Sequence, residues 1–196
     1  MVVFAWCAHQ GLPWAAVGAG GFLLAAAAMA WSGFGAGDPA VVLGLAGLAR
    51  RAVAWSIAGV AIGVAAGLLH RSALNLPLQP SEGVEPFVAV ACLVGATEEL
   101  IYRGWLLGRA RVFGWPSAVV LAAVAHAAYK TALFAWPAVP GAFDLAGIFI
   151  WTFAGGLILG ALRVVSGSLM PATLAHVAFD FVVYRSFAHA PWWVWG

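Results

Sequence analysis

Long apolar runs alternate with short polar or proline-containing segments along most of the chain. A helix that spans a membrane needs about 20 consecutive apolar residues. Residues 39–49 are apolar but too few to span, and we expect them to lie at the membrane interface or to extend the next helix. The pattern predicts about six spanning helices, which cover residues 13–32, 52–69, 86–107, 115–135, 145–163 and 168–186.

Composition agrees with this pattern. Of the 196 residues, 64% are hydrophobic and 8% are charged, whereas a soluble domain has about 25% charged residues. The formal net charge is +2 and no basic run occurs, which argues against a nucleic-acid partner. We therefore predict an all-α, polytopic membrane helix bundle with the lipid bilayer as its surroundings.

Arginines are distributed unevenly between the two sets of loops that six spans create. Because arginine and lysine favour cytoplasmic loops, the richer set is predicted to be cytoplasmic, and both termini are predicted to lie outside the cytoplasm. The richer set holds Arg50, Arg51, Arg109, Arg111 and Arg163, and the other set holds Arg71 and Arg185.

The stretch CLVGATEELIYRG, residues 92–104, places three charges inside an apolar run. Charge is costly to bury in hydrocarbon, so ionisable residues at membrane depth are candidates for a functional site. Glu99 and Arg103 are four residues apart and can pair on one helix face. Glu98 is turned by about 100° from Glu99. We expect Arg103 to neutralise Glu99 and Glu98 to project into a polar cavity as a candidate general base.

Two later predicted helices carry further polar residues. His126 lies in the fourth predicted span, and His176 and Asp180 lie four residues apart in the sixth, where they share a face. Counted from the cytoplasmic arginines, Glu98, His126 and His176 lie roughly 16–23 Å along their helices. Each residue alone also fits a structural role, but residues at one depth on three helices can meet in one cavity. Lys130, one turn after His126, is expected to snorkel to the interface or to pair.

Two kinds of chemistry are open to such a cluster. Two histidines with carboxylates can bind a divalent metal ion, most suitably zinc, with His126, His176, Glu98 and Asp180 as possible ligands. The same groups can polarise water without a metal, with a carboxylate as the base and the histidines as orienting or oxyanion-stabilising groups. The choice between no cofactor and one divalent metal stays open at this point.

These residues resemble the motifs of a known family. The run EELIYRG resembles the EExxxR motif of the CPBP family, and SGSLMPATLAHVAFD resembles its third motif. His126 falls where the histidine of the second motif belongs. CPBP proteins are intramembrane proteases, also called CAAX-protease-like or Abi proteins, and are related to the type II CAAX prenyl endopeptidase. The resemblance covers about residues 86–185 and implies a four-helix catalytic core within 86–190, preceded by N-terminal helices and loops in 1–85.

The resemblance also implies roles for the individual residues. Glu98 would activate water with His126 as its partner, and His176 with Asp180 would stabilise the oxyanion. The second acid and the arginine of the motif, Glu99 and Arg103, would give structural support.

Two positions depart from the family pattern. Ala122 replaces a usual phenylalanine, and we expect it to loosen the packing or widen the cavity. Asp180 stands where asparagine is frequent. Because an ionised aspartate cannot donate a hydrogen bond, Asp180 must be protonated, orient His176 or bind a metal.

The sequence thus predicts an intramembrane endopeptidase, of the glutamate type or metal-dependent, in a bacterial inner membrane. Its expected partner is a membrane-anchored peptide or protein substrate. A non-catalytic immunity or sorting partner is a second hypothesis, although the complete set of candidate catalytic residues argues against it. An ion-coupled transporter is a third, because buried carboxylates and histidines also form proton relays, but the chain shows no inverted repeat. A haem held by the two histidines is a minor fourth.

Overall fold

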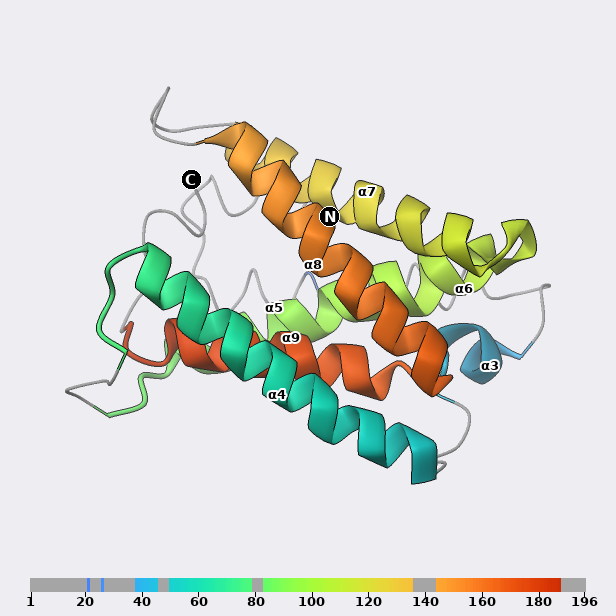
Figure 1. Cartoon of the computed structure of the whole chain (residues 1–196), viewed down its shortest axis with the longest axis horizontal. Helices are drawn as coiled ribbons and strands as arrows, with labels where there is room; N and C mark the ends of the chain where they lie inside the picture. The colour runs from blue at the N-terminus through green and yellow to red at the C-terminus, as the bar shows by residue number, and fades with distance from the viewer. Residues whose placement is uncertain are drawn as a thin grey trace.

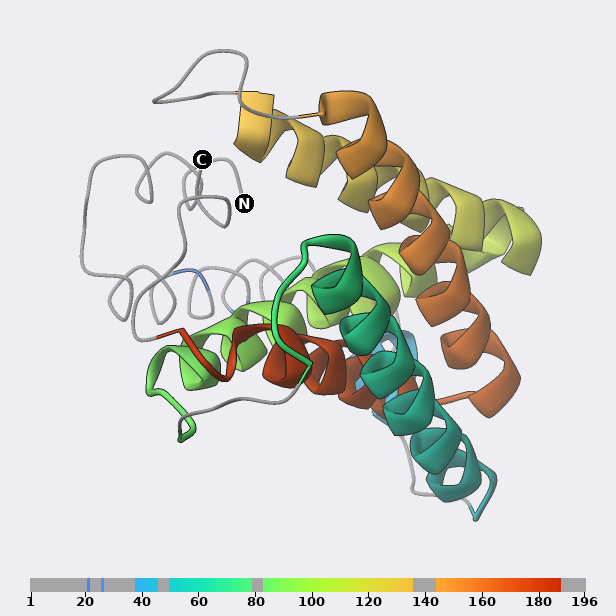
Figure 2. The same cartoon turned by 60° about the vertical axis from the view of Figure 1, so that its left-hand side comes forward.

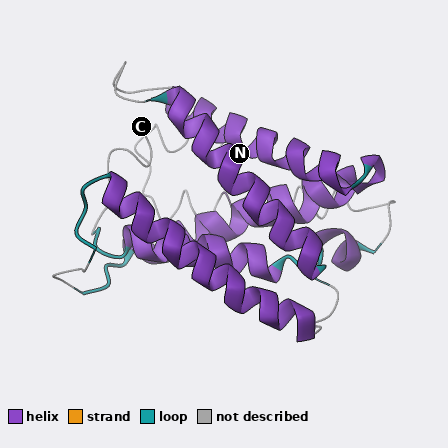
Figure 3. Cartoon of the chain, in the orientation of Figure 1, coloured by secondary structure: helices purple, strands orange, loops and turns teal. Residues whose placement is uncertain are grey.

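The computed structural model describes residues 38–45, 50–78, 83–135 and 144–187, together with two isolated residues near position 24. Within these residues the chain forms helices joined by short loops and contains no strand (Figure 3). The predicted span 13–32 and both termini lie almost wholly outside the described residues. The all-helical fold class is confirmed.

The described helices follow the predicted apolar runs. Three of them, α4, α7 and α8, are long and apolar enough to cross a membrane, and α9 is a shorter apolar helix. An integral membrane helix bundle is therefore confirmed. The elements in order are α3 (Pro39–Leu43), α4 (Arg50–Ala73), α5 (Phe87–Glu99), the π-helix η1 (Leu100–Leu106), α6 (Leu107–Ala110), the 3₁₀ turn η2 (Arg111–Phe113), α7 (Trp115–Ala135), α8 (Leu145–Ser166) and α9 (Met170–Tyr184).

The predicted helix 86–107 is one continuous helical run whose middle is a π-helix. The junction residues Leu100 and Leu107 both keep right-handed helical dihedral angles, so α5, η1 and α6 follow one another without a break. π-helical segments inside α-helices are rare and often lie at functional sites. Here the π-helix begins directly after Glu99.

Helix α4 packs along α9 through a stripe of glycines (Figures 1 and 2). A side chain at Gly59 would meet the carbonyl of Pro171, and one at Gly63 would meet the carbonyl of Ala175. Gly67 continues the stripe one turn later. Small residues let membrane helices approach closely, so this stripe sets the position of α9 and joins the predicted N-terminal part of the chain to the predicted core.

Glycines also join α7 to α8; in Figure 1 α7 lies along the upper edge and α8 runs from the upper left to the lower right. A Cβ atom at Gly156 would lie 2.8 Å from the Cβ of Ala123, and one at Gly160 would lie 2.8 Å from Val119. The same Gly156 position is 3.2 Å from the guanidinium of Arg103. The close approach of α8 therefore covers Arg103 from one side.

Residues 39–43 form a separate short helix, α3, and so do not extend the next helix. Helix α3 ends at Gly44, whose φ of 73° is left-handed and closes the helix with two backbone hydrogen bonds. The helix packs against η1 and α6, and Gly108 of α6 has no room for a side chain beside the carbonyl of Val42. Residues 46–49 lie outside the described part.

Arg71 is buried, contrary to its predicted place in a loop. It lies in the last turn of α4 with 1% of its surface exposed. Its guanidinium donates to the carbonyls of Pro77, Val182 and Val183 and contacts the hydroxyl of Ser186. Arg71 therefore caps the C-terminal end of α9, where unpaired carbonyls favour a cation.

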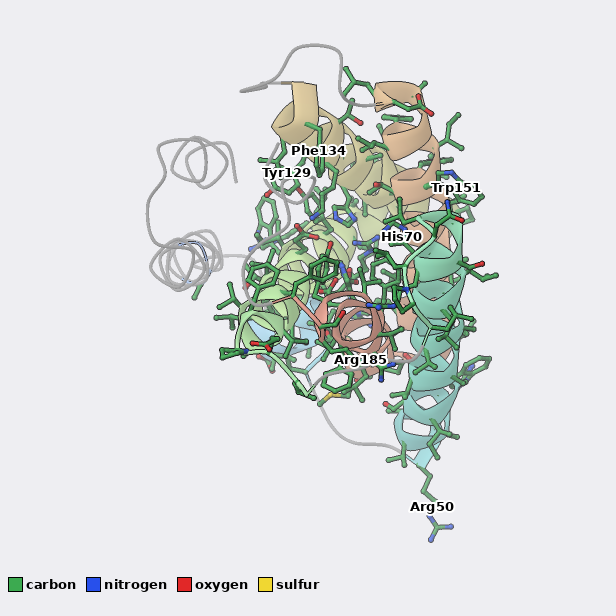
Figure 4. The ribbon with its side chains drawn as sticks, turned by 90° about the vertical axis from the view of Figure 1, so that its left-hand side faces the viewer. Arg50, His70, Tyr129, Phe134, Trp151 and Arg185 are labelled. Carbon is green, nitrogen blue, oxygen red and sulfur yellow. The ribbon has the colours of Figure 1, made fainter. Side chains whose placement is uncertain are left out.

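Large apolar side chains face outward along the long helices. Ile57 and Leu69 of α4 and Trp151 of α8 are 70%, 72% and 78% exposed. Figure 4 shows Trp151 pointing away from the bundle and Arg50 extending past the end of α4. Such a surface is unfavourable in water and suits contact with lipid.

Candidate active site

Ionisable side chains from four elements meet in the interior of the bundle. Most of them are buried, and each contacts at least one other member of the group. The depth of Glu98, His126 and His176 along their helices predicts that they meet, and the structure brings these three residues together. The cluster consists of Glu98 and Glu99 of α5, Arg103 of η1, His126 and Lys130 of α7, and His176 and Asp180 of α9.

Glu98 is fully buried and contacts three side chains. Its Oε2 atom lies 3.0 Å from Nε2 of His126 and 3.8 Å from Nε2 of His176. Its Oε1 atom lies 2.7 Å from Nζ of Lys130. Glu98 therefore has Lys130 as a counter-ion, and of the two alternatives expected for Lys130, snorkelling or pairing, the structure shows pairing. The spacing of four residues between His126 and Lys130 places both on one face of α7, and this spacing is the sequence signal for the ion pair.

The hydrogen bonds of His126 fix its tautomer. Arg103 can only donate, and its NH1 group lies 3.0 Å from Nδ1 of His126. The Nδ1 atom therefore accepts, so the proton is on Nε2 and is donated to Glu98. Tyr102 stacks on the ring, with centroids 4.6 Å apart. His126 is thus a neutral donor held in line with Glu98.

Glu99 connects Arg103 to His176. Its Oε1 atom accepts from NH1 of Arg103 at 2.9 Å, so the predicted pair of Glu99 and Arg103 is present. The same oxygen lies 2.8 Å from Nδ1 of His176. The Nε2 atom of that ring then faces Glu98 and Asp180, each at 3.8 Å. Glu99 therefore orients a histidine as well as pairing with Arg103.

Gly95 makes room for Asp180. A side chain at Gly95 would meet the Asp180 carboxylate and would lie 3.1 Å from the ring of His176. The glycine stands three residues before Glu98, on the side of α5 that faces α9. The sequence run GATEE thus combines an open helix face with the acids that use it.

A cavity of about 40 Å³ adjoins this cluster. One water needs about 10–15 Å³, so the space admits water beside the carboxylates. The hydroxyl of Tyr129 is buried and has no hydrogen-bond partner within the described structure. The polar residues that line the cavity are Glu98, Tyr129, Lys130, His176, Asp180 and Tyr184.

Ala122 does not line the cavity. It is 1% exposed and belongs to an apolar cluster with Leu107, Ala110 and Ala118. Because α7 packs against α6 at this level, the small side chain faces that helix. The expectation that Ala122 widens the cavity is therefore wrong.

The charges of the cluster nearly balance. Three carboxylates face two permanent cations, Arg103 and Lys130. One further proton, on His176 or on Asp180, makes the total neutral. Neutrality is favoured because a net charge is costly to hold in an apolar interior. A second proton on His176 would lie on Nε2, which faces the cavity side of the ring.

The contacts of the described residues in the cluster leave no complete set of ligands for a metal ion. Among the described residues, no three histidine, cysteine, aspartate or glutamate side chains are placed to hold one. Both ring nitrogens of His126 already have partners, Arg103 and Glu98. A zinc ion bound by His126 and Glu98 would have to turn that ring and displace Lys130. The residues as placed do not fit a zinc ion.

A family model agrees with the motifs. The model described as type II CAAX prenyl endopeptidase Rce1-like matches residues 80–182, which include every residue of the polar cluster. No curated protein and no solved structure matches the chain. The matched segment is more than half of the 196 residues. The chain therefore belongs to the type II CAAX prenyl endopeptidase Rce1-like family, a family of proteases.

Proposed function

We propose that this protein is an intramembrane endopeptidase that hydrolyses a peptide bond in a membrane-anchored peptide or protein. The observation that carries the proposal is that Glu98 and His176 line one cavity inside an apolar helix bundle, with His126 hydrogen-bonded to Glu98. A carboxylate, an oriented imidazole and space for water are the components of general-base hydrolysis.

In the proposed reaction Glu98 is the base. A water in the cavity gives a proton to the Glu98 carboxylate while its oxygen attacks the carbonyl carbon of the substrate. The Nε2 proton of His126 holds the carboxylate in position at 3.0 Å. The carbonyl oxygen gains a negative charge as the new carbon–oxygen bond forms.

His176 is placed to stabilise this oxyanion. Its Nδ1 atom donates to Glu99, so a doubly protonated ring would present Nε2–H toward the cavity. Donors aimed at a developing oxyanion are among the largest contributors to catalysis. Glu98 then returns its proton to the departing amide nitrogen, the carbon–nitrogen bond breaks, and a carboxylic acid and an amine result. The cluster supports this route without a metal, since the ligands that zinc would need are engaged.

The rest of the cavity wall suits an apolar substrate. Phe87, Ala91 and Val94 of α5 and Leu133 of α7 also line it, and the first three lie along the same face of α5 as Glu98. An apolar group of a peptide held at the membrane by a lipid group or by an apolar helix suits this part of the wall. The family description is that of a CAAX prenyl endopeptidase, so a prenylated CAAX peptide is one candidate for such a substrate.

The test is cleavage by purified protein in liposomes. One arm uses a farnesylated peptide with a C-terminal CAAX sequence, and the other uses a library of membrane-anchored peptides read by mass spectrometry. Glu98→Gln keeps the shape of the side chain and removes the base, so cleavage should fall by about 10²–10⁴-fold. The matched control is Glu85→Gln, since Glu85 precedes α5 and is outside the cavity.

Full cleavage by Glu98→Gln would refute the assignment of the base. If an inactive Glu98→Gln protein still performs its role in cells, the protein acts instead as a non-catalytic partner. The thermal unfolding temperature of Glu98→Gln is compared with that of the native protein, and a match shows that the variant is folded in both experiments.

A further inference from the structure

Only some of the polar side chains that line the cavity can donate a hydrogen bond. Glu98 and Asp180, when ionised, can only accept hydrogen bonds. The donors that line the cavity are Tyr129, Lys130, His176 and Tyr184. Among the described lining residues, Lys130 is the one lysine or arginine. Arg103 is fully buried on the other side of the histidines and does not line the cavity.

Lys130 is both paired and accessible. Its Nζ atom lies 2.7 Å from Oε1 of Glu98, while 26% of its side chain is exposed. The ammonium lies 5.9 Å from the centre of the Tyr129 ring, a distance at which the ring attracts a cation. An ammonium group has three donors, and the contact with Glu98 uses one of them. The other two remain for a ligand in the cavity.

In the proposed reaction, negative charge disappears from Glu98 and appears on the substrate, both close to Lys130. When water gives its proton to Glu98, that carboxylate becomes neutral. At the same time a negative charge forms on the carbonyl oxygen of the substrate, next to the attacking water. Lys130 therefore loses one anionic partner as another appears close by, and its flexible four-carbon stem allows the small displacement.

We propose that Lys130 is a further catalytic residue, whose ammonium group pairs with Glu98 before the reaction and with the oxyanion during it, beside His176. The proposal rests on the endopeptidase function above. It also explains how the site can work with an aspartate at position 180. An ionised Asp180 next to His176 cannot donate to the oxyanion, so Lys130 of α7 supplies the second donor.

The experiment compares Lys130→Met, Lys130→Arg and the double variant Lys130→Met/Asp180→Asn on the farnesylated CAAX peptide in liposomes, with the anchored-peptide library as the second substrate. Loss of one oxyanion donor should lower kcat of Lys130→Met by about 10²–10³-fold and leave KM nearly unchanged. Lys130→Arg keeps a cation and its donors, so its kcat should stay within about tenfold of the native value. An amide at position 180 adds a donor beside His176, so the double variant should regain at least about tenfold of the lost kcat.

Three results would overturn the proposal: an unchanged kcat in Lys130→Met, a rise in KM alone, or no recovery in the double variant. A role for Lys130 in the charge balance alone is separated by the variant Lys130→Met/Asp180→Ala, which restores that balance but adds no donor. If Lys130 is an oxyanion donor, this variant should show no recovery, and a recovery equal to that of Lys130→Met/Asp180→Asn would overturn the proposal. If Lys130→Met does not fold, Lys130→Gln keeps a hydrogen bond to Glu98 and a neutral donor without the charge. Its kcat should then fall below that of Lys130→Arg, and an unchanged kcat in Lys130→Gln would overturn the proposal. Activity that survives in Lys130→Met but is lost in Glu98→Gln would reject this proposal alone, whereas activity in Glu98→Gln would reject the proposed function.

Discussion

The contact between α4 and α9 offers a test of how the fold positions the residues that we propose to be catalytic. Gly63 has no room for a side chain, because an added Cβ would meet the carbonyl oxygen of Ala175 and lie 2.8 Å from its carbonyl carbon. These are backbone atoms within a helix and cannot turn aside as a flexible side chain can. Ala175 directly precedes His176, so any displacement of α9 at this point moves a residue of the site.

The expected magnitude follows from two opposing effects of Gly63→Ala. Replacing a helical glycine by alanine stabilises a helix by about 0.5–1 kcal/mol. Forcing an extra group into a filled interface costs about 1–3 kcal/mol. Gly155→Ala on α8 is the matched control, since nothing lies within 4 Å of its added Cβ. Because both variants gain the same helix propensity, their difference reports the clash alone and should be about 1–3 kcal/mol.

The measurement is thermal unfolding in detergent, followed by circular dichroism. For a chain of this length about 2–4 °C corresponds to 1 kcal/mol, so Gly63→Ala should unfold at a clearly lower temperature than Gly155→Ala. Cleavage should also fall in Gly63→Ala, because a catalytic group displaced by about 1 Å can lose about 10²-fold in rate. Equal unfolding temperatures for the two variants would show that the glycine stripe does not hold α9.

Two further predictions concern the cap of α9 and the metal. Arg71→Met leaves the carbonyls of Val182 and Val183 without their donor. The free energy of unfolding should therefore fall by about 1.5–3 kcal/mol, which thermal unfolding in detergent measures. Arg51→Met is the control, because Arg51 is exposed at the start of α4. Treatment with a zinc chelator should leave cleavage unchanged, because His126 already uses both ring nitrogens. Loss of cleavage that added zinc restores would contradict this.

The helices were largely predictable because their apolar runs end at strong signals. The predicted span 145–163 corresponds to α8, which begins after Asp144 and ends at Gly167 with a left-handed φ of 73°. The predicted end of α4 near residue 69 was too early, since the helix continues to Ala73. The reason is tertiary: Arg71 is stabilised by carbonyls of α9 more than 100 residues later, which no local pattern reveals.

The site was predictable in depth and in helical phase, but not in its pairings. Residue counts along the helices placed Glu98, His126 and His176 at one level, and a spacing of four residues predicted the pair of Glu99 and Arg103. The contact of Glu98 with Lys130 depends on how α7 is rotated about its axis. That rotation is set by close packing against α6 and α8, so it follows from the assembled bundle and not from one helix alone.

The two adjacent acids of the motif have different tasks, and the geometry explains why both are needed beside one arginine. Glu99 and Arg103 hold Nδ1 of one histidine each, His176 and His126 respectively. In consequence both rings turn Nε2 toward the same oxygen of Glu98, at 3.8 Å and 3.0 Å. One ion pair on the far side of the rings thus orients both imidazoles toward Glu98. The π-helix that starts after Glu99 carries Arg103 to the point where it reaches both Glu99 and α7, so this widened turn is part of the site.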